Sequence, residues 1–180
     1  MSGNVRYPWY IAWRYRLIRS AKDLWSLIDR RLRVSRVEKG LYLGGKLTPA
    51  RTRYLEERGV QAVISLQSEA LDPMGPFRAH LWLPSFDGRP PVAEQLLLGA
   101  EFIRQQLDAG HGVYVHCHAG VGRAPTLVAV YYLLRGLSPQ ESVQRVREAR
   151  PFVRMNRYQL EAIESCFALL QRRRTKKEAI

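Results

Sequence analysis

The chain has 180 residues, of which 46% are hydrophobic, and a formal net charge of +13. This length fits one globular domain with a core and is too short for two ordinary domains. The two cysteines, Cys117 and Cys166, are too few for a disulfide scaffold and indicate a reducing compartment.

The first 33 residues are basic and rich in aromatic side chains. Large apolar residues recur there at helical spacing, with arginines and lysines between them: Trp9, Trp13, Leu17, Leu24, Ile28 and Leu32. We expect an amphipathic helix over residues 1–33. The pattern leaves two alternatives open, namely that the apolar stripe packs on the domain or that the helix contacts an anionic membrane surface.

The rest of the chain is nearly neutral except at its end. Residues 1–40 carry a charge of +7, residues 41–167 carry +2 and residues 168–180 carry +4. We recognise no secretory signal and no stretch of about 18 uncharged apolar residues that would span a membrane. We therefore expect a cytoplasmic protein whose membrane contact, if it has one, is peripheral.

Residues 34–170 are expected to form one domain, followed by a basic tail over residues 171–180. Short β-type runs occur at 40–43, 60–66, 81–83 and 113–116. Helices are expected at 51–58 and 92–108, and from Arg123, Ser138 and Tyr158 onward; Ser138, Pro139 and Glu141 form a capping-box pattern. Strands that alternate with helices predict an α/β fold with a central mixed sheet flanked by helices.

The segment from His116 to Arg123 connects an expected strand to an expected helix. Such a loop directs successive backbone N–H groups into one concavity, and the helix N-terminus adds partial positive charge. Gly120 and Gly122 permit the backbone angles that the loop needs. A cysteine placed in the same field, as Cys117 is, is expected to favour the thiolate. Arg123 offers two parallel hydrogen bonds to a phosphate, so the loop predicts phosphate chemistry with Cys117 as nucleophile.

Transfer of a phosphoryl group to Cys117 requires an acid that protonates the leaving oxygen. The best candidate is Asp87, which lies in a turn-rich loop thirty residues before Cys117. Asp72 is the second candidate. This chemistry needs neither a metal nor an organic cofactor.

The His-Cys-x5-Arg pattern resembles the signature of the protein tyrosine phosphatase superfamily. The segment 40–45, Gly-Leu-Tyr-Leu-Gly-Gly, and the position of Asp87 resemble its compact dual-specificity branch. The resemblance covers roughly residues 34–170. It implies that His116 tunes the thiolate, that Asp87 is the general acid, and that phosphate is bound by the backbone of His118, Ala119, Gly120, Val121, Gly122 and Arg123.

One position departs from the family pattern. Family members usually carry serine or threonine directly after the arginine, where the hydroxyl helps the cysteine to leave; this chain has Ala124 there. Thr126 is the nearest hydroxyl further along the helix. The departure predicts slow hydrolysis of the phosphoenzyme, although residues 119–125 closely resemble the loop of plant glucan phosphatases.

The substrate stays open at this point. A phosphorylated protein is the family's commonest implication, while a phospholipid, as in the related phosphatidylglycerophosphate phosphatases, would explain the basic N-terminal helix. A phosphoglucan is a third candidate substrate. Two alternatives lie outside monoester hydrolysis, namely an RNA 5′-triphosphatase and a phosphate-binding module without turnover. Among these readings we expect no nucleic-acid partner. Three arginines either add charge near the site or are ordinary surface residues: Arg89, Arg154 and Arg157.

Overall fold

The computed structural model of the chain describes residues 34–72 and 75–178. The helix expected over residues 1–33 lies outside the described residues. In chain order the described elements are β1 (Val34–Glu38), β2 (Leu41–Gly44), α2 (Pro49–Glu56), β3 (Val60–Gln67), β4 (Ala79–Ser85), α3 (Ala93–Asp108), β5 (Gly112–His116), α4 (Arg123–Leu134), α5 (Pro139–Ala149) and α6 (Arg157–Glu178).

The strands form one mixed sheet in the order β1-β2-β5-β3-β4. Strands β2, β5, β3 and β4 are parallel, whereas β1 pairs antiparallel to β2 at one edge. Every residue of β5 is buried, as expected for a parallel strand covered on both faces. The carboxyl ends of four parallel strands therefore meet at one edge of the sheet, where α/β proteins bind ligands.

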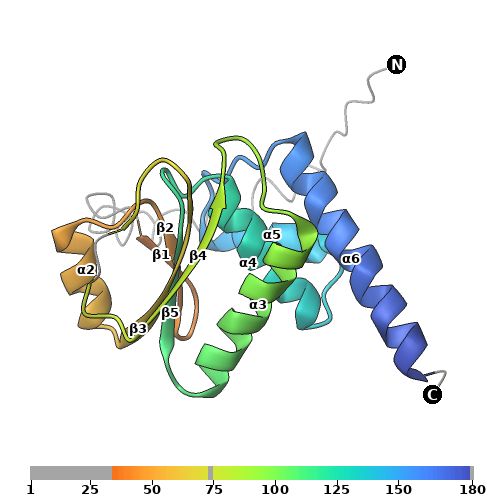
Figure 1. The fold of residues 1–180 in the computed structure, drawn as a ribbon, viewed down its shortest axis with the longest axis horizontal. Coiled ribbons are helices and arrows are strands. Elements are labelled where there is room, and N and C mark those ends of the chain that lie inside the picture. Colours follow the sequence, from red (N-terminus) through yellow and green to blue (C-terminus); the bar gives the residue numbers. More distant parts are fainter. Residues whose placement is uncertain (1–33, 73–74, 179–180) are drawn as a thin grey trace, which may run out of the picture. The chain divides into compact units, whose positions relative to one another are not determined.

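Helices cover both faces of the sheet. Figure 1 shows α2 on one side and α3, α4, α5 and α6 together on the other. Helix α4 is buried around almost its whole circumference, because it packs against α3, α5 and α6 as well as the sheet. The expected α/β class with a helix-flanked mixed sheet is confirmed. The first residue of α4 is Arg123, so the core rigidly positions one end of the predicted loop.

Local signals define most of the helix starts. The capping box of α5 is present: Ser138 Oγ accepts from the backbone N–H of Glu141, whose carboxylate accepts from the N–H of Ser138. At α2 the side chain of Thr48 is a simple N-cap, which accepts from the backbone N–H of Arg51. Helix α6 continues through residues 171–178, which belong to the basic tail.

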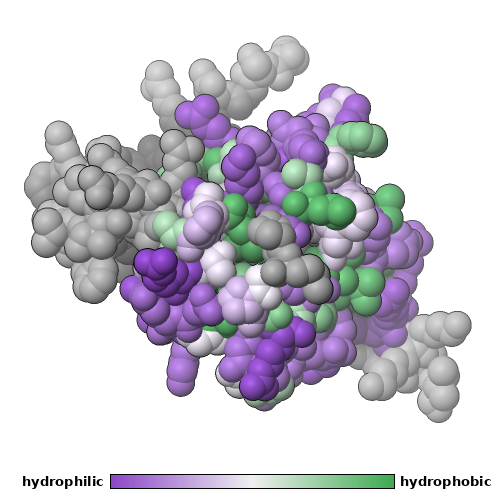
Figure 2. All heavy atoms as spheres, turned by 60° about the vertical axis from the view of Figure 1, so that its left-hand side comes forward, coloured by the Kyte–Doolittle hydropathy of each residue, from purple (hydrophilic) through white to green (hydrophobic). Residues whose placement is uncertain are grey.

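Strand β1 was not predicted. It adds an edge strand before the first expected one, and its residue Ser35 pairs with Leu43 of β2. No helix among the described residues is long and apolar enough to cross a membrane. Figure 2 shows a surface on which hydrophilic side chains surround scattered hydrophobic ones.

Candidate active site

The predicted loop leaves β5 after His116 and enters α4 at Arg123. Gly120 adopts a φ of +70°, and a Cβ atom there would lie 2.3 Å from the carbonyl group of Gly44. Two neighbouring segments hold the loop from outside: the N–H of Lys46 donates to the carbonyl of His118 at 3.0 Å, and the N–H of Arg154 donates to that of Val121 at 2.8 Å. These contacts fix the loop tightly against the ends of the parallel strands.

Cys117 lies at the base of this loop and is only 2% exposed. The N–H of Gly120 donates to its Sγ atom at 3.3 Å. The thiol also lies close to the N-terminus of α4, where the helix dipole favours negative charge. Both features stabilise a thiolate more than a thiol.

His116 is completely buried behind the cysteine. Its ring stacks on Tyr114 with centroids 5.3 Å apart, and its Nε2 atom lies 3.1 Å from Asp72 Oδ2. Burial acts to raise the pKa of Asp72, but the contact with His116 outweighs it and holds the pKa below its usual range. The structure thus places the second candidate acid, Asp72, against His116.

Arg123 is held by a residue that the sequence analysis missed. Glu69, in the loop after β3, accepts from Nη1 of Arg123 at 3.0 Å and from Nη2 at 2.8 Å. This hydrogen bonding lowers the pKa of Glu69 to about 2. One signal in the sequence could have indicated Glu69: it lies two residues after the carboxyl end of a parallel strand, where α/β proteins bind ligands.

The remaining donors of Arg123 show how the guanidinium is oriented. Nη1 also donates to the carbonyl of Ser85 at 2.8 Å, and Nη2 lies 3.1 Å from Asp87 Oδ1. Within the described part of the chain, the buried Nε atom has no hydrogen-bond partner. Glu69 therefore binds the terminal edge of the guanidinium and leaves Nε available to an oxyanion.

Asp87 lies in the loop after β4, and its side chain is 86% exposed. Gly88 has a φ of +73°, and Asn156 Nδ2 donates to its carbonyl at 2.7 Å. Asn156 precedes α6 and also accepts from the N–H of Gln159 at 3.1 Å. The start of α6 thus holds the loop that brings Asp87 to Arg123.

A second missed residue lies beneath the loop. Arg150, which follows α5, is completely buried and donates to the carbonyls of Gly120 and Ala119. No motif in the sequence distinguishes it from the surface arginines of the same segment.

The residue that follows Arg123 is shielded from solvent and carries no hydroxyl group. Ala124 is fully buried, and the hydroxyl of Thr126 donates to the carbonyl of Gly122 at 2.9 Å. Because this backbone contact occupies its proton, Thr126 does not offer the cysteine the donor that Ala124 lacks.

Three further arginines were candidates for added positive charge at the site, and all three are exposed: Arg89, Arg154 and Arg157. The guanidinium of Arg89 lies 3.8 Å from the ring centroid of Tyr158, and the backbone of Arg154 contacts the loop. The side chain of Arg157 is 74% exposed and lies 3.5 Å from Glu161. Arg89 and Arg154 thus border the site, whereas Arg157 is engaged along the surface of α6.

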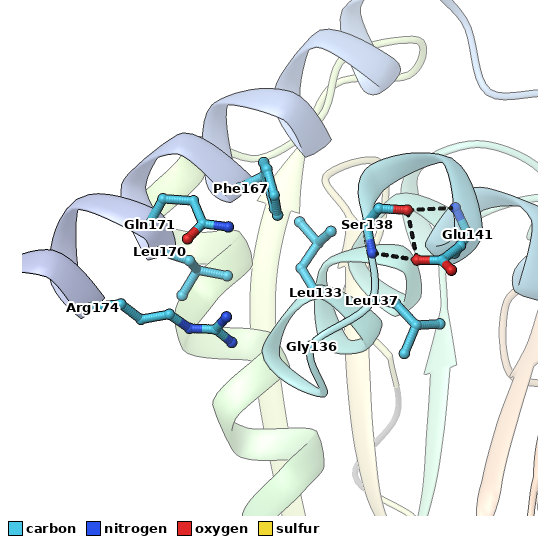
Figure 3. Close-up of a pocket in the computed structure, with 9 residues that line it drawn as sticks. All are labelled: Leu133, Gly136, Leu137, Ser138, Glu141, Phe167, Leu170, Gln171 and Arg174. Atoms are coloured by element: carbon cyan, nitrogen blue, oxygen red, sulfur yellow. Dashed lines mark hydrogen bonds between the residues drawn. The ribbon is translucent and has the colours of Figure 1, made fainter.

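The pocket in Figure 3 is a different feature. Leu133, Leu137, Phe167 and Leu170 line it between the end of α4 and the middle of α6, with the capping box of α5 at its rim. None of the loop residues contributes to it. Among residues 34–72 and 75–178, no cluster of histidine, cysteine or carboxylate side chains is suited to a metal ion.

Comparison with known proteins agrees with this geometry. Residues 39–137 match the family described as "Polymorphic toxin system, DSP-PTPase phosphatase". Dual specificity protein phosphatase 12 of Rattus norvegicus is 33% identical over 125 residues, which are 67% of this chain and 37% of that protein. Phosphatidylglycerophosphate phosphatase PTPMT1 of Arabidopsis thaliana is 32% identical over 136 residues, covering 71% of this chain and 40% of that protein.

Solved structures show the same fold. The crystal structure of PTPMT1 superimposes with a TM-score of 0.72 and 26% identity, over 79% of this chain and 99% of that one. Fold and loop together define the class of cysteine-dependent phosphatases. Within it, the chain belongs to the compact dual-specificity phosphatase family. It spans less than half the length of the curated relatives described above.

Proposed function

We propose that the chain hydrolyses phosphate monoesters through a phosphocysteine intermediate and acts on phosphorylated protein side chains of more than one kind. One observation carries the proposal: Cys117, Arg123 and Asp87 converge on a single anion-binding loop. The N–H of Gly120 contacts Sγ at 3.3 Å, and Arg123 Nη2 lies 3.1 Å from Asp87 Oδ1.

In the first step the thiolate of Cys117 attacks phosphorus and forms the S–P bond. The ester P–O bond breaks, and Asp87, in its acid form, gives its proton to the leaving oxygen. Arg123 and the backbone N–H groups of residues 118–123 bind the other phosphate oxygens, including the charge that develops in the transition state.

In the second step water attacks the phosphocysteine. The carboxylate of Asp87 now takes a proton from that water, the S–P bond breaks, and the thiolate leaves with inorganic phosphate as the other product. His116 tunes the thiolate from behind. The side chain of His118 is exposed, which supports a role in substrate choice rather than in binding the phosphoryl group.

Phosphorylated protein is the substrate that we favour. The high exposure of Asp87 supports an open site that admits phosphoserine and phosphothreonine as well as phosphotyrosine. The name of the rat relative, dual specificity protein phosphatase, agrees with this choice. The location proposed with it is cytoplasmic.

A phospholipid is the second candidate, and a specific observation favours it. Two aromatic side chains are exposed: Phe86 at 78%, which directly precedes Asp87 in the loop after β4, and Phe152 at 51%, whose ring lies against the guanidinium of Arg150. Exposed aromatics next to Arg89 and Arg154 suit an anionic lipid surface. PTPMT1 has been crystallised in complex with PI(5)P. In this variant of the proposal, residues 1–33 supply the peripheral membrane contact.

The test measures phosphate release by the wild type, Cys117→Ser and Asp87→Ala in the presence of chelator. The substrates are a small aryl phosphate, phosphotyrosine and phosphothreonine peptides, phosphatidylglycerophosphate in vesicles, and a phosphoglucan. We expect no turnover by Cys117→Ser and a fall in kcat of about 100-fold or more for Asp87→Ala. Asp108→Ala, an exposed aspartate on α3, is the matched control and should retain full activity.

The outcomes separate the alternatives. Faster turnover of peptides supports the proposal, and faster turnover of vesicles replaces the protein substrate with a lipid. A wild type that binds phosphate analogues but hydrolyses no member of the panel would be a phosphate-binding module, and the proposed enzyme function would be wrong.

A further inference from the structure

Arg150 makes several contacts that converge beneath the phosphate loop. Its Nε donates to the carbonyl of Gly120 at 2.7 Å, and its Nη2 donates to the carbonyl of Ala119 at 3.4 Å. Its Nη1 donates to Ser35 Oγ at 3.1 Å, and its guanidinium lies 4.2 Å from the ring centroid of Phe152. The side chain is completely buried, so the guanidinium is a fixed cation and not a solvated one.

The contact with Ala119 determines where a neighbouring N–H group points. A peptide unit is planar and trans, so its C=O and N–H point in opposite directions. The carbonyl of Ala119 and the N–H of Gly120 belong to one such unit. Arg150 holds its carbonyl end, and the N–H end donates to Cys117 Sγ at 3.3 Å. The unit is therefore a dipole with a cation at its negative end and the sulfur at its positive end.

The contact with Gly120 does the same for the next unit. The carbonyl of Gly120 and the N–H of Val121 share a peptide plane, and the carbonyl receives the shorter of the two hydrogen bonds from Arg150. The N–H of Val121 must therefore point away from Arg150. Two consecutive donors are oriented by one side chain. The fork of a guanidinium can reach both carbonyls at once, which a lysine ammonium does less well.

Ser35 connects this arrangement to the edge of the sheet. Ser35 lies in β1 and pairs with Leu43 of β2. The residue after Leu43 is Gly44, whose carbonyl group lies against Gly120. Strand β1, the end of α5 and the loop thus meet at Arg150.

We propose that Arg150 is a positioning residue of the phosphate site: it holds the Ala119 and Gly120 carbonyls outward, so that two N–H groups point at the thiolate and the phosphate. The inference rests on the proposed function of the loop. In this proposal a buried arginine outside the Cys-x5-Arg segment strengthens the binding of an oxyanion and stabilises the thiolate. Arg150 does so without contact to the substrate.

The experiment compares the wild type with Arg150→Met, and with Arg147→Met as control. Arg147 lies on α5, which ends directly before Arg150, and is exposed. Two readouts need no substrate: the dissociation constant of tungstate, and the pH dependence of Cys117 alkylation by iodoacetate. For Arg150→Met we expect tungstate binding about 10- to 100-fold weaker and an alkylation profile shifted to higher pH, because misplaced donors stabilise charge less well. Arg147→Met should match the wild type in both.

A folded Arg150→Met with unchanged tungstate affinity and an unchanged alkylation profile would overturn the proposal. If Arg150→Met does not fold, Arg150→Lys decides in the same assays. It keeps the charge but not the fork, so at least severalfold weaker tungstate binding is expected, and wild-type values would again refute the proposal. Should the wild type itself fail to bind tungstate, the proposed function is at fault rather than Arg150.

Discussion

The carboxylate of Glu69 bridges both terminal nitrogens of Arg123, at 3.0 and 2.8 Å. The guanidinium of Arg123, the proposed phosphate clamp, is therefore held in place by another side chain of the site. A clamp that needs no reordering loses less conformational entropy when the ligand binds. The bidentate geometry also leaves the buried Nε atom facing away from Glu69.

Replacement of Glu69 by glutamine should therefore impair the clamp. An amide accepts through a single oxygen and adds an N–H next to a guanidinium, so one of the two hydrogen bonds is lost. We expect kcat/KM for an aryl phosphate to fall about 10- to 100-fold. Phosphate should inhibit the variant more weakly by a similar factor. Glu56→Gln, at an exposed position of α2, is the control; equal losses in both variants would contradict this role.

The same ion pair predicts a pH dependence of stability. The hydrogen bond with Arg123 lowers the pKa of Glu69 from 4.5 to about 2 in the folded chain. Because the folded pKa is depressed, the stabilisation is complete above pH 4.5 and is lost as the pH falls toward 2. The Glu69 side chain is 39% exposed, so salt should weaken the effect.

Urea unfolding of the wild type and Glu69→Gln between pH 2 and 7 measures this dependence. The stability difference should favour the wild type at neutral pH and shrink through the window from 4.5 to 2. A difference that stays constant over this range would show that the ion pair contributes no net stability.

The loop between β5 and α4 could be predicted from sequence because its features are local. Cys117, the glycines and Arg123 lie within seven consecutive residues, and the helix that follows continues directly from the arginine. The capping box at Ser138 is equally local, and its hydrogen bonds are present. Each prediction rested on neighbours in the chain, where spacing defines geometry.

The supporting residues could not be found in this way. Glu69 lies 54 residues before Arg123, and Arg150 lies 115 residues after Ser35; only the folded sheet brings these pairs together. Both are charged residues in segments with other charged residues, so composition does not identify them. Strand β1 was missed for a related reason, since its pairing with β2 is what makes it a strand.

Gly120→Ala should disrupt the loop through contact and not through backbone angle alone. An added Cβ would lie 2.3 Å from the Gly44 carbonyl group, and φ at Gly120 is +70°. Gly110 is a matched control, because its φ is +79° but a Cβ there would meet no atom within 4 Å. Gly110→Ala should cost about 1 kcal/mol of stability, whereas Gly120→Ala should cost more and also abolish tungstate binding.

Thermal unfolding and tungstate titration of both variants test this expectation. If the two glycine variants lose the same stability and both still bind tungstate, the close approach of Gly44 does not constrain the loop.

Ala124→Ser should accelerate the second half of the reaction. Position 124 directly follows Arg123 and is fully buried, and the Thr126 hydroxyl is engaged with the Gly122 carbonyl. A serine hydroxyl there can donate to the cysteine sulfur as the S–P bond breaks. A hydrogen bond to a charged group contributes about 1.5–3 kcal/mol, so phosphocysteine hydrolysis should be about tenfold faster or more.

Stopped-flow measurement with an aryl phosphate resolves the two steps. The wild type should release one equivalent of phenol in a burst before a slower steady state, because hydrolysis of the phosphocysteine limits turnover. In Ala124→Ser the burst should shrink and kcat should rise. Ala129→Ser places the same hydroxyl in the buried part of α4 away from the loop and should keep the wild-type burst. An unaltered burst and kcat in Ala124→Ser would mean that departure of the cysteine needs no hydroxyl in this chain.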